Sequence, residues 1–203
     1  MLTALITGEK GQKWFRLIDK VFAERNLWAA FQQVAEKKGA AGVDRVTVAQ
    51  FEKQLPDSVW ELSDQLRAGQ YRPQAVRRVY IPKPGSTEQR PLGIPAVRDR
   101  VVQAAVVNVI EPIFERDFAE QSYGFRPGRG CKDALRRVDE LLKAGYAHVV
   151  DADLKGYFDS IPHDPLMARL KEKVADGPVL SLIEKFLKAN ILDGLEEWVL
   201  PHF

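Results

Sequence analysis

Residues 147–164 read AHVVDADLKGYFDSIPHD, and this stretch decides how the rest of the chain is interpreted. Its first half, residues 147–154, is a short apolar run without helical periodicity, and breakers flank it, so we predict a buried β-strand there. Alternate side chains of a strand share one face. Val149, Asp151 and Asp153 are therefore expected to point the same way, which places two carboxylates on one side of the strand.

Two acids on a buried strand need an explanation. An ionised carboxylate at the edge of an apolar core is costly unless it is paired, hydrogen-bonded or bound to a metal. Arginine side chains or backbone amides could satisfy both acids for purely structural reasons, and a metal site is the functional alternative. Taken as an anonymous pair, the acids leave both interpretations open.

Ahead of this strand, the first third of the chain is expected to be helical. Apolar residues recur at helical spacing over residues 13–25, and a second helix is predicted to follow with Asn26 as its cap. Thr47 and Gln50 form a capping-box pattern at the start of a short helix. A further helix is predicted to end at Gly69.

The pattern then changes to β and later returns to helix. Residues 75–95 predict a hairpin, because AVRRVYI at 75–81 mixes β-branched and aromatic residues, the turn-rich stretch PKPGSTEQ follows, and RPLGIP returns at 90–95. Asp99 is placed to cap a long helix, and a strongly amphipathic helix should start near Cys131 and bury that thiol in the core. Asp164 and Pro178 mark the starts of two last helices. The predicted fold class is α+β.

Composition excludes several classes of protein. The chain has 203 residues, of which 45% are hydrophobic and 29% charged. This composition is neither that of a disordered protein nor that of a membrane protein. One cysteine rules out an internal disulfide, and the three scattered histidines rule out a zinc module. The start of the sequence resembles no targeting peptide, and no apolar run would cross a membrane. We expect a cytoplasmic protein without a membrane partner.

Charge is unevenly distributed along the chain. The formal net charge is only +2, but residues 70–137 hold 13 Lys and Arg against 7 acids, so this window carries +6 and the remainder −4. Eleven of those 13 cations are arginine, whose planar fork suits phosphate. A surface for a polyanion is one interpretation. A solvated face with incidental arginines is the other.

The continuation of the opening stretch favours the functional alternative, because residues 151–164 resemble the first catalytic motif of reverse transcriptases, in the form found in group II intron-encoded proteins and their bacterial relatives. The family pattern is Asp, an aliphatic residue, two variable positions, two aromatics and Asp. Here it is met by Asp153, Leu154, Tyr157, Phe158 and Asp159.

Further stretches agree with this resemblance in order and spacing. YIPKPGSTEQRPLGIPAVRDRVVQ, residues 80–103, resembles the fingers hairpin of the family, and QSYGFRPGRGCKDAL, residues 121–135, resembles the loop and helix before its catalytic strand. KGAAGVD at 38–44 and YRPQAVRRV at 71–79 fit the amino-terminal extension and the entry to the fingers. The resemblance covers roughly residues 13–195.

The resemblance implies a fold and a domain division. The expected architecture is a reverse-transcriptase fingers region with a helical amino-terminal extension and an incomplete palm sheet. Residues 1–70 would form the extension and the start of the fingers, 71–145 the fingers, and 146–203 a partial palm with the first catalytic motif.

The resemblance also implies catalytic roles. Nucleotidyl transfer uses two divalent cations. Asp153 would be the catalytic carboxylate and a magnesium ligand, together with the main-chain carbonyl of Leu154, while Asp151 is expected to be buried and hydrogen-bonded. Residues around the incoming nucleotide would be Lys83 and Arg90 on the hairpin, the backbone of Gly156 and Tyr157, and Phe158, which would exclude a 2′-hydroxyl.

Other arginines are expected to contact nucleic acid. Arg77, Arg78, Arg126 and Arg129 would touch the RNA template or structured intron RNA, fixing position without reading sequence. The implied partners of the parent enzyme are template and intron RNA, a DNA primer and deoxynucleoside triphosphates.

One part of the family pattern is missing. The family continues with a Pro-Gln-Gly motif and a Tyr-x-Asp-Asp hairpin that carries the other metal-binding acids, and this sequence has no Asp-Asp pair. We therefore expect this polypeptide to be the fingers and partial palm of a longer enzyme, inactive as a polymerase by itself. The free edge of the predicted strand should promote a dimer or higher oligomer.

Three functions follow from these observations. The first is a portion of an RNA-directed DNA polymerase. The second is a non-catalytic module that binds structured RNA and assists splicing, like an intron maturase. A metal nuclease is a more distant third, since only Asp151, Asp153 and Asp159 are close in sequence.

Overall fold

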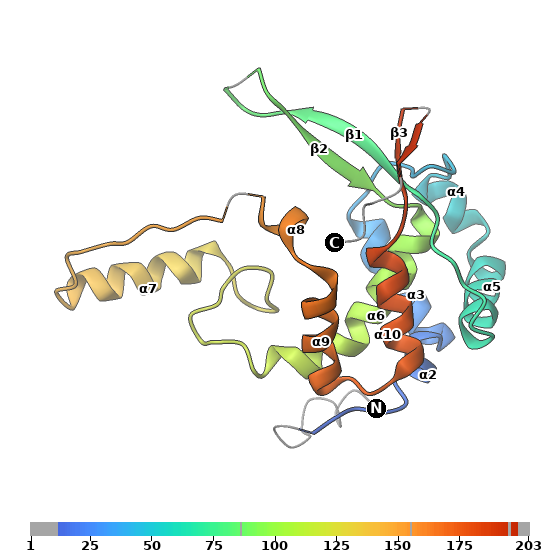
Figure 1. Cartoon of the computed structure of the whole chain (residues 1–203), viewed down its shortest axis with the longest axis horizontal. Helices are drawn as coiled ribbons and strands as arrows, with labels where there is room; N and C mark the ends of the chain where they lie inside the picture. Colours follow the sequence, from blue (N-terminus) through green and yellow to red (C-terminus); the bar gives the residue numbers. More distant parts are fainter. Residues whose placement is uncertain (1–11, 86, 155, 195, 199–203) are drawn as a thin grey trace.

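The computed structural model describes residues 12–85, 87–154, 156–194 and 196–198. Helices dominate, and Figure 1 shows them beside a small twisted sheet. The elements in chain order are α2 (Ile18–Val21), α3 (Glu24–Glu36), α4 (Val48–Lys53), α5 (Leu55–Arg67), β1 (Val76–Pro82), β2 (Gln89–Ile94), α6 (Val97–Glu115), α7 (Cys131–Lys143), α8 (Tyr157–Ser160), α9 (His163–Lys173), α10 (Gly177–Leu187), β3 (Ile191–Asp193) and β4 (Glu196–Trp198). The α+β prediction is confirmed. No helix of this described part is long and apolar enough to cross a bilayer.

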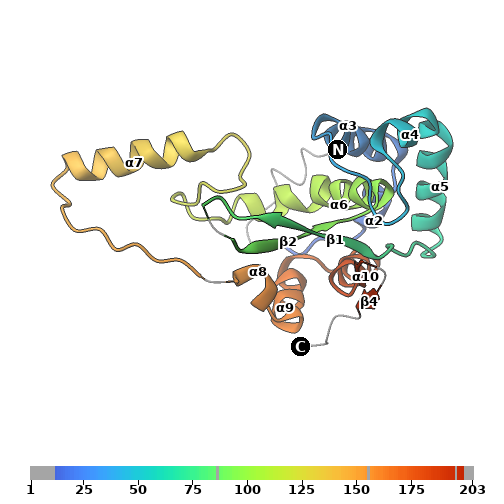
Figure 2. The same cartoon turned by 90° about the horizontal axis from the view of Figure 1, so that it is seen from above.

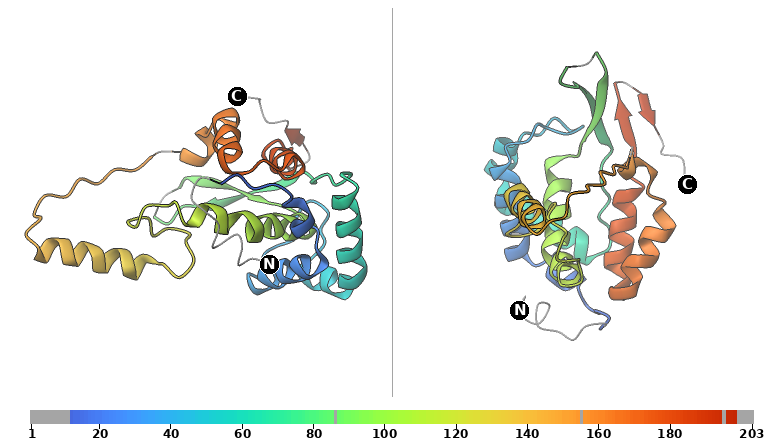
Figure 3. Two further views of the ribbon diagram at one scale, coloured as in Figure 1. Left: turned by 90° about the horizontal axis from the view of Figure 1, so that it is seen from below. Right: turned by 90° about the vertical axis from the view of Figure 1, so that its left-hand side faces the viewer.

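The hydrophobic core is built around α6. Its apolar side chains Val101, Val102 and Ile113 are fully buried, and they pack with buried residues of α3, α5 and α10. Figure 3 shows α9 and α10 on one side of α6 and the amino-terminal helices on the other. Helix α6 therefore joins the two halves of the chain.

The sheet has the order β2-β1-β3-β4. Strands β1 and β2 form the predicted antiparallel hairpin, with Arg77 opposite Ile94 and Pro82 opposite Gln89. Strand β3 pairs with β1 in parallel, which is possible because α6 to α10 provide the long crossover that parallel strands need. The later strand lies at 191–193 and not at 147–154, where it was predicted.

The amino-terminal helix is shorter than predicted. Instead of a continuous helix over residues 13–25, Trp14 forms a β-bridge with Val174, and the helical residues are the four of α2 and the first two of α3. The carboxylate of Asp176 accepts hydrogen bonds from the backbone N–H of Leu17 and of Ile18, and also caps α10. Helical spacing does not produce a helix here, because tertiary hydrogen bonds hold residues 14–18 against residues 173–176.

One of the four predicted caps is confirmed. Thr47 and Gln50 form the predicted capping box of α4. Asp99 does not cap α6, whose cap position is Ala96, and Asp164 lies inside α9 behind Pro162. Asn26 lies inside α3, where its amide donates to the carbonyls of Lys20, Val21 and Ala105. Asp99 and Asn26 bond to residues distant in sequence instead of capping a helix, and Asp164 is already the second residue of its helix.

Helix α7 forms as predicted but packs against nothing in the described structure. It projects away from the other helices, as Figures 1 and 2 show. None of its residues is buried, and the prediction that Cys131 lies in the core is wrong because this cysteine is exposed. Ion pairs one turn apart support the helix locally, Arg136 with Asp133, Arg137 with Glu140 and Lys143 with Asp139.

The segment that returns from α7 is also unlike the prediction. Residues 147–154 have no regular secondary structure and are exposed, so neither the buried strand nor the burial of Asp151 is found. Val150 is 92% exposed. A strand needs a neighbouring strand to satisfy its backbone, and in the sheet that the structure describes none of the strands pairs with this segment.

Candidate nucleotide and nucleic-acid site

The predicted catalytic motif lies where the extended segment meets α8. Asp153 and Leu154 are exposed and precede α8, and Gly156 occupies the left-handed region with φ of 61°, which glycine adopts without strain. The rings of Tyr157 and Phe158 follow on α8 with their centroids 5.6 Å apart. Phe158 is 80% exposed, so its ring is available as a surface and is not part of the core.

A magnesium site is not complete among these residues. Mg²⁺ prefers oxygen ligands and usually takes one or two carboxylates from the protein. No three His, Cys, Asp or Glu side chains come close enough to share a metal ion in the part of the chain that the structure describes. Asp153 and the carbonyl of Leu154 are suitable donors by chemistry, but they do not by themselves make the site.

The fingers hairpin presents the two predicted cations differently. Lys83 pairs with Glu88 at 2.5 Å across the turn, and its backbone N–H donates to the carbonyl of Glu88. Both side chains are exposed, so water and salt weaken the pair and a stronger anion could displace Glu88. Arg90, opposite Ile81 on the other strand, is exposed. The hairpin and α8 lie on the side of the molecule from which α7 projects (Figures 1 and 2).

Arg77 and Arg78 follow one another on β1 and point to different partners. Arg77 Nη2 donates to the carbonyl of Ala41 at 2.7 Å, and Arg78 Nη1 lies 3.4 Å from the carboxylate of Asp193 on β3. Both arginines are half-buried. They hold protein segments together and leave only part of each guanidinium accessible.

A second arginine joins Arg77 in fixing the loop over residues 38–44. Arg100 Nη2 donates to the carbonyl of Ala40 at 2.6 Å, and burial lowers the pKa of this arginine. Gly42 packs so closely on α6 that a Cβ there would be 2.5 Å from the backbone of Ala96. Sequence reasoning missed Arg100. Its position one turn into α6 gave no sign of the loop that it contacts.

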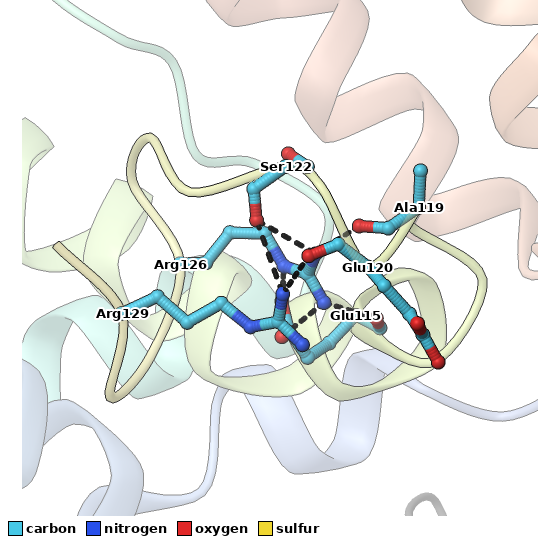
Figure 4. A network of polar contacts seen from close by, with 6 residues as sticks. All are labelled: Glu115, Ala119, Glu120, Ser122, Arg126 and Arg129. Carbon is cyan, nitrogen blue, oxygen red and sulfur yellow. Dashed lines mark hydrogen bonds and ion pairs between the residues drawn. The ribbon is translucent and has the colours of Figure 1, made fainter. Parts of the chain in front are cut away.

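Arg126 is the centre of a polar network that holds the loop between α6 and α7, shown in Figure 4. Its guanidinium contacts both carboxylate oxygens of Glu115, at 2.7 to 3.0 Å, and the carbonyls of Glu115, Ala119 and Ser122. The hydrogen bond from Arg126 lowers the pKa of the Glu115 carboxyl. The side chain of Arg126 is only 6% exposed, so its donors are engaged inside the protein.

Arg129 extends the same network at its solvent side. Its Nη1 donates to the carbonyl of Glu120, and its guanidinium lies over the ring of Tyr123. This arginine is exposed. The two predicted RNA contacts of this loop therefore differ. Arg129 is accessible to a ligand, whereas Arg126 is buried and fixes the loop backbone that carries Arg129.

A buried hydroxyl–carboxylate pair was also missed. Tyr71 OH donates to Asp99 Oδ1 at 2.6 Å, and the backbone N–H of Gln74 donates to Asp99 Oδ2 at 2.9 Å. Burial raises the pKa of Asp99, an effect that these two hydrogen bonds oppose. The pair fixes the segment that leads from α5 into the hairpin. The sequence around Asp99 suggests a helix cap and contains no sign of Tyr71, because the two residues are 28 positions apart.

Comparison with known proteins identifies the family of the chain. The family model described as reverse transcriptase (RNA-dependent DNA polymerase) matches residues 81–200, more than half of the chain. The chain is 39% identical over 184 residues to protein YkfC of Escherichia coli (strain K12), covering 88% of the chain and 48% of that protein. It is 38% identical over 169 residues to the group II intron-encoded protein LtrA of Lactococcus lactis, covering 82% of the chain and 28% of LtrA.

Plant proteins and solved structures extend the comparison. The chain is 37% identical over 108 residues to nuclear intron maturase 1, mitochondrial, of Arabidopsis thaliana, covering 53% of the chain and 15% of that protein. A chain of a Cas6-RT-Cas1–Cas2 complex matches with a TM-score of 0.59 and 21% identity over 92% of this chain and 19% of that one, which is a likeness of fold. The present chain spans about half of YkfC and less than a third of LtrA.

Proposed function

Because this chain belongs to the reverse transcriptase family, in its group II intron-encoded and maturase branch, we propose that it supplies the fingers and part of the palm of an RNA-directed DNA polymerase. The observation that carries the proposal is that the hairpin β1–β2 and helix α8, which holds Tyr157 and Phe158 of the motif, lie on one side of the molecule (Figure 2). That side would hold the nucleotide and the end of the primer.

Within that proposal each predicted residue has a role. Asp153 and the carbonyl of Leu154 are the oxygens that this chain would offer to magnesium, and the remaining ligands would come from outside the described residues. Lys83 and Arg90 would neutralise the triphosphate, with Lys83 exchanging Glu88 for phosphate. The backbone of Gly156 and Tyr157 would line the nucleotide pocket, and the exposed ring of Phe158 would lie under the sugar.

RNA binding is the task that we assign to this chain itself. Arg129 would contact phosphate directly, and Arg77, Arg78 and Arg126 would act chiefly by holding the loops and strands that face RNA. The partners of the whole protein would be template or intron RNA, a DNA primer and deoxynucleoside triphosphates. A maturase-like role in splicing, without chemistry by the protein, is the second candidate, and the maturase named among the relatives favours it.

Self-association is the remaining part of the proposal. Leu135 and Leu142 on α7 are 66% and 52% exposed, and Val149 and Val150 of the returning segment are more exposed still. Apolar surface of this extent commonly marks an interaction site. A second copy that covers α7 would remove it from water, and the chain would then be a dimer or higher oligomer.

The RNA-binding proposal is tested by salt dependence. If the chain contacts phosphates, the logarithm of its affinity for a labelled RNA hairpin falls linearly with the logarithm of salt concentration, with a slope set by the number of contacts. Fluorescence anisotropy measures this. An affinity that is insensitive to salt would remove the proposal.

The polymerase proposal is tested in the whole protein. Asp153→Asn should abolish primer extension on an RNA template and leave RNA affinity within about twofold, because only a ligand for a cation is changed. Asp151→Asn is the matched control, since it removes a neighbouring exposed carboxylate that we place outside the reaction. Equal activity of the two variants would contradict the role of Asp153.

A further inference from the structure

An open hollow of about 430 Å³ lies where the linker between α5 and β1 meets the carboxyl-terminal end of α10. Its lining includes Arg72 from the linker and Ser181, Glu184, Lys185 and Lys188 from α10 and the residue after it. The two walls are more than 100 residues apart in sequence. In Figure 1, α5 and α10 lie away from α7 and from the tip of the hairpin, so this hollow is separate from the nucleotide side.

The charges in the hollow are not balanced. It contains three cations and one carboxylate, and Glu184 pairs with Lys188 at 2.6 Å. Arg72 and Lys185 have no carboxylate partner among the residues that the structure describes. Arg72 Nη1 donates to the carbonyls of Gly69 and Tyr71, and Lys185 Nζ donates to the same carbonyl of Tyr71 at 3.2 Å.

The two unbalanced cations are held close to each other at a cost. Like charges repel, and neutral carbonyls compensate less than a carboxylate would. Burial, and secondly the charge of Arg72, lower the pKa of Lys185. A bound anion would offset both effects, because it favours the charged form of a lysine.

The walls of the hollow are fixed before any ligand arrives. Tyr71, whose carbonyl orients both cations, is 1% exposed and is anchored through its hydroxyl to Asp99. The backbone N–H of Val76, the first residue of β1, donates to the carbonyl of Asn190 at 2.7 Å, which joins the end of the linker to the segment that follows α10. The arrangement is therefore preorganised and does not depend on flexible surface side chains alone.

The chemistry of the hollow suits phosphate. A guanidinium and ammonium groups bind phosphate oxygens well, and the exposed hydroxyl of Ser181 can add a hydrogen bond. The lining contains no aromatic side chain on which a base could stack, so a backbone would be bound without regard to sequence. We propose that this hollow binds a backbone phosphate of RNA, which extends the RNA footprint beyond the hairpin. The inference rests on the proposed RNA-binding function.

The test compares two double variants of the 203-residue chain. Arg72→Gln/Lys185→Met removes the two unbalanced cations and keeps the apolar stem of the lysine. Arg169→Gln/Lys53→Gln is the control, because it removes the same net charge from exposed sites on α9 and α4. Binding of a fluorescein-labelled RNA hairpin is measured by anisotropy at several salt concentrations, and circular dichroism checks that each variant is folded.

The expected result is that the hollow variant binds about tenfold more weakly at low salt and that its salt slope is smaller by about 1, while the control stays within about twofold of the wild type. If Arg72→Gln/Lys185→Met does not fold, the single change at the exposed Arg72 replaces it, with about half the effect on the logarithm of affinity.

Two other outcomes would overturn the inference. Wild-type binding with an unchanged hollow variant would reject the hollow and leave the proposed RNA-binding function standing, whereas a wild type that binds no RNA would reject both. A free nucleotide is the other source of phosphate, and titration with ATP tests it. If the hollow variant lost ATP binding while its RNA binding stayed at the wild-type level, the hollow would bind a free nucleotide and not the RNA backbone.

Discussion

Tyr71 and Asp99 share a hydrogen bond of 2.6 Å in the interior, between the segment that enters the hairpin and the first turn of α6. The carbonyl of the same tyrosine accepts hydrogen bonds from Arg72 and Lys185 in the hollow beside α10. This pair therefore connects the core with two surfaces to which we assign nucleic-acid contacts, and it is the first place to test the architecture.

Tyr71→Phe should lower the free energy of unfolding by about 1–3 kcal/mol, because it leaves a buried carboxylate oxygen of Asp99 without its donor. Urea titration followed by circular dichroism measures the change. Tyr146→Phe is the matched control, since Tyr146 is 66% exposed and its change should be within about 0.5 kcal/mol of zero. Equal effects at the two positions would contradict the role of the pair.

The same pair predicts a pH dependence. Burial, and then the charge of Asp99, raise the pKa of Tyr71 above its ordinary value of about 10. The unfolded chain therefore releases this proton at lower pH than the folded chain, and stability is fully present below about pH 10 and falls as pH rises further. Thermal unfolding between neutral and alkaline pH should show this loss, and Tyr71→Phe should reduce it. A variant with the same alkaline loss would show that other groups cause it.

Gly42→Ala should destabilise the chain by about 1–3 kcal/mol or more, because the new Cβ would lie 2.5 Å from backbone atoms of Ala96 that cannot move aside. Gly124→Ala is the control, since a Cβ at that position meets nothing within 4 Å. Denaturant unfolding compares the two variants. Similar stabilities would mean that the loop over 38–44 is not packed on α6 as described.

Glu115→Gln should loosen the loop between α6 and α7, because it removes the charge that Arg126 binds with two donors. The pKa of Glu115 is lowered in the folded state, so its contribution is present above its ordinary pKa and is lost as pH falls through the lowered value. Hydrogen exchange of residues 116–130 at neutral pH should be faster in the variant. When both proteins are measured at the same acid pH, the exchange rate of the wild type should approach that of the variant. Equal exchange rates of the two proteins at neutral pH would contradict the role of Arg126.

Self-association should depend on the exposed stripe of α7. Analytical ultracentrifugation at micromolar concentration is expected to show a dimer or larger species for the wild type. Leu135→Glu/Leu142→Glu should shift it towards monomer, because each glutamate would have to be buried at the interface. Trp60→Glu, at an exposed position on α5, is the control. A monomeric wild type would remove this part of the proposal.

Local signals in the sequence were sufficient for many of the elements. The capping box of Thr47 and Gln50, the turn-rich stretch inside the hairpin and the apolar periods of α6, α7 and α10 all act over a few residues, and the structure contains each of them. The family resemblance, carried by the motif at 153–159, was likewise a property of contiguous residues, and the match to the reverse transcriptase model confirms it.

Burial and long-range partners were decided only by the tertiary structure. The period of α7 predicted a helix correctly, but whether Cys131 is buried depends on a surface that faces it, and periodicity carries no information about that surface. The same applies to the strand expected at 147–154, to Asp99 with Tyr71, and to Arg126 with Glu115. The chemical type of a side chain determines what kind of group it can bind. Which residue becomes its partner depends on how segments distant in sequence pack together.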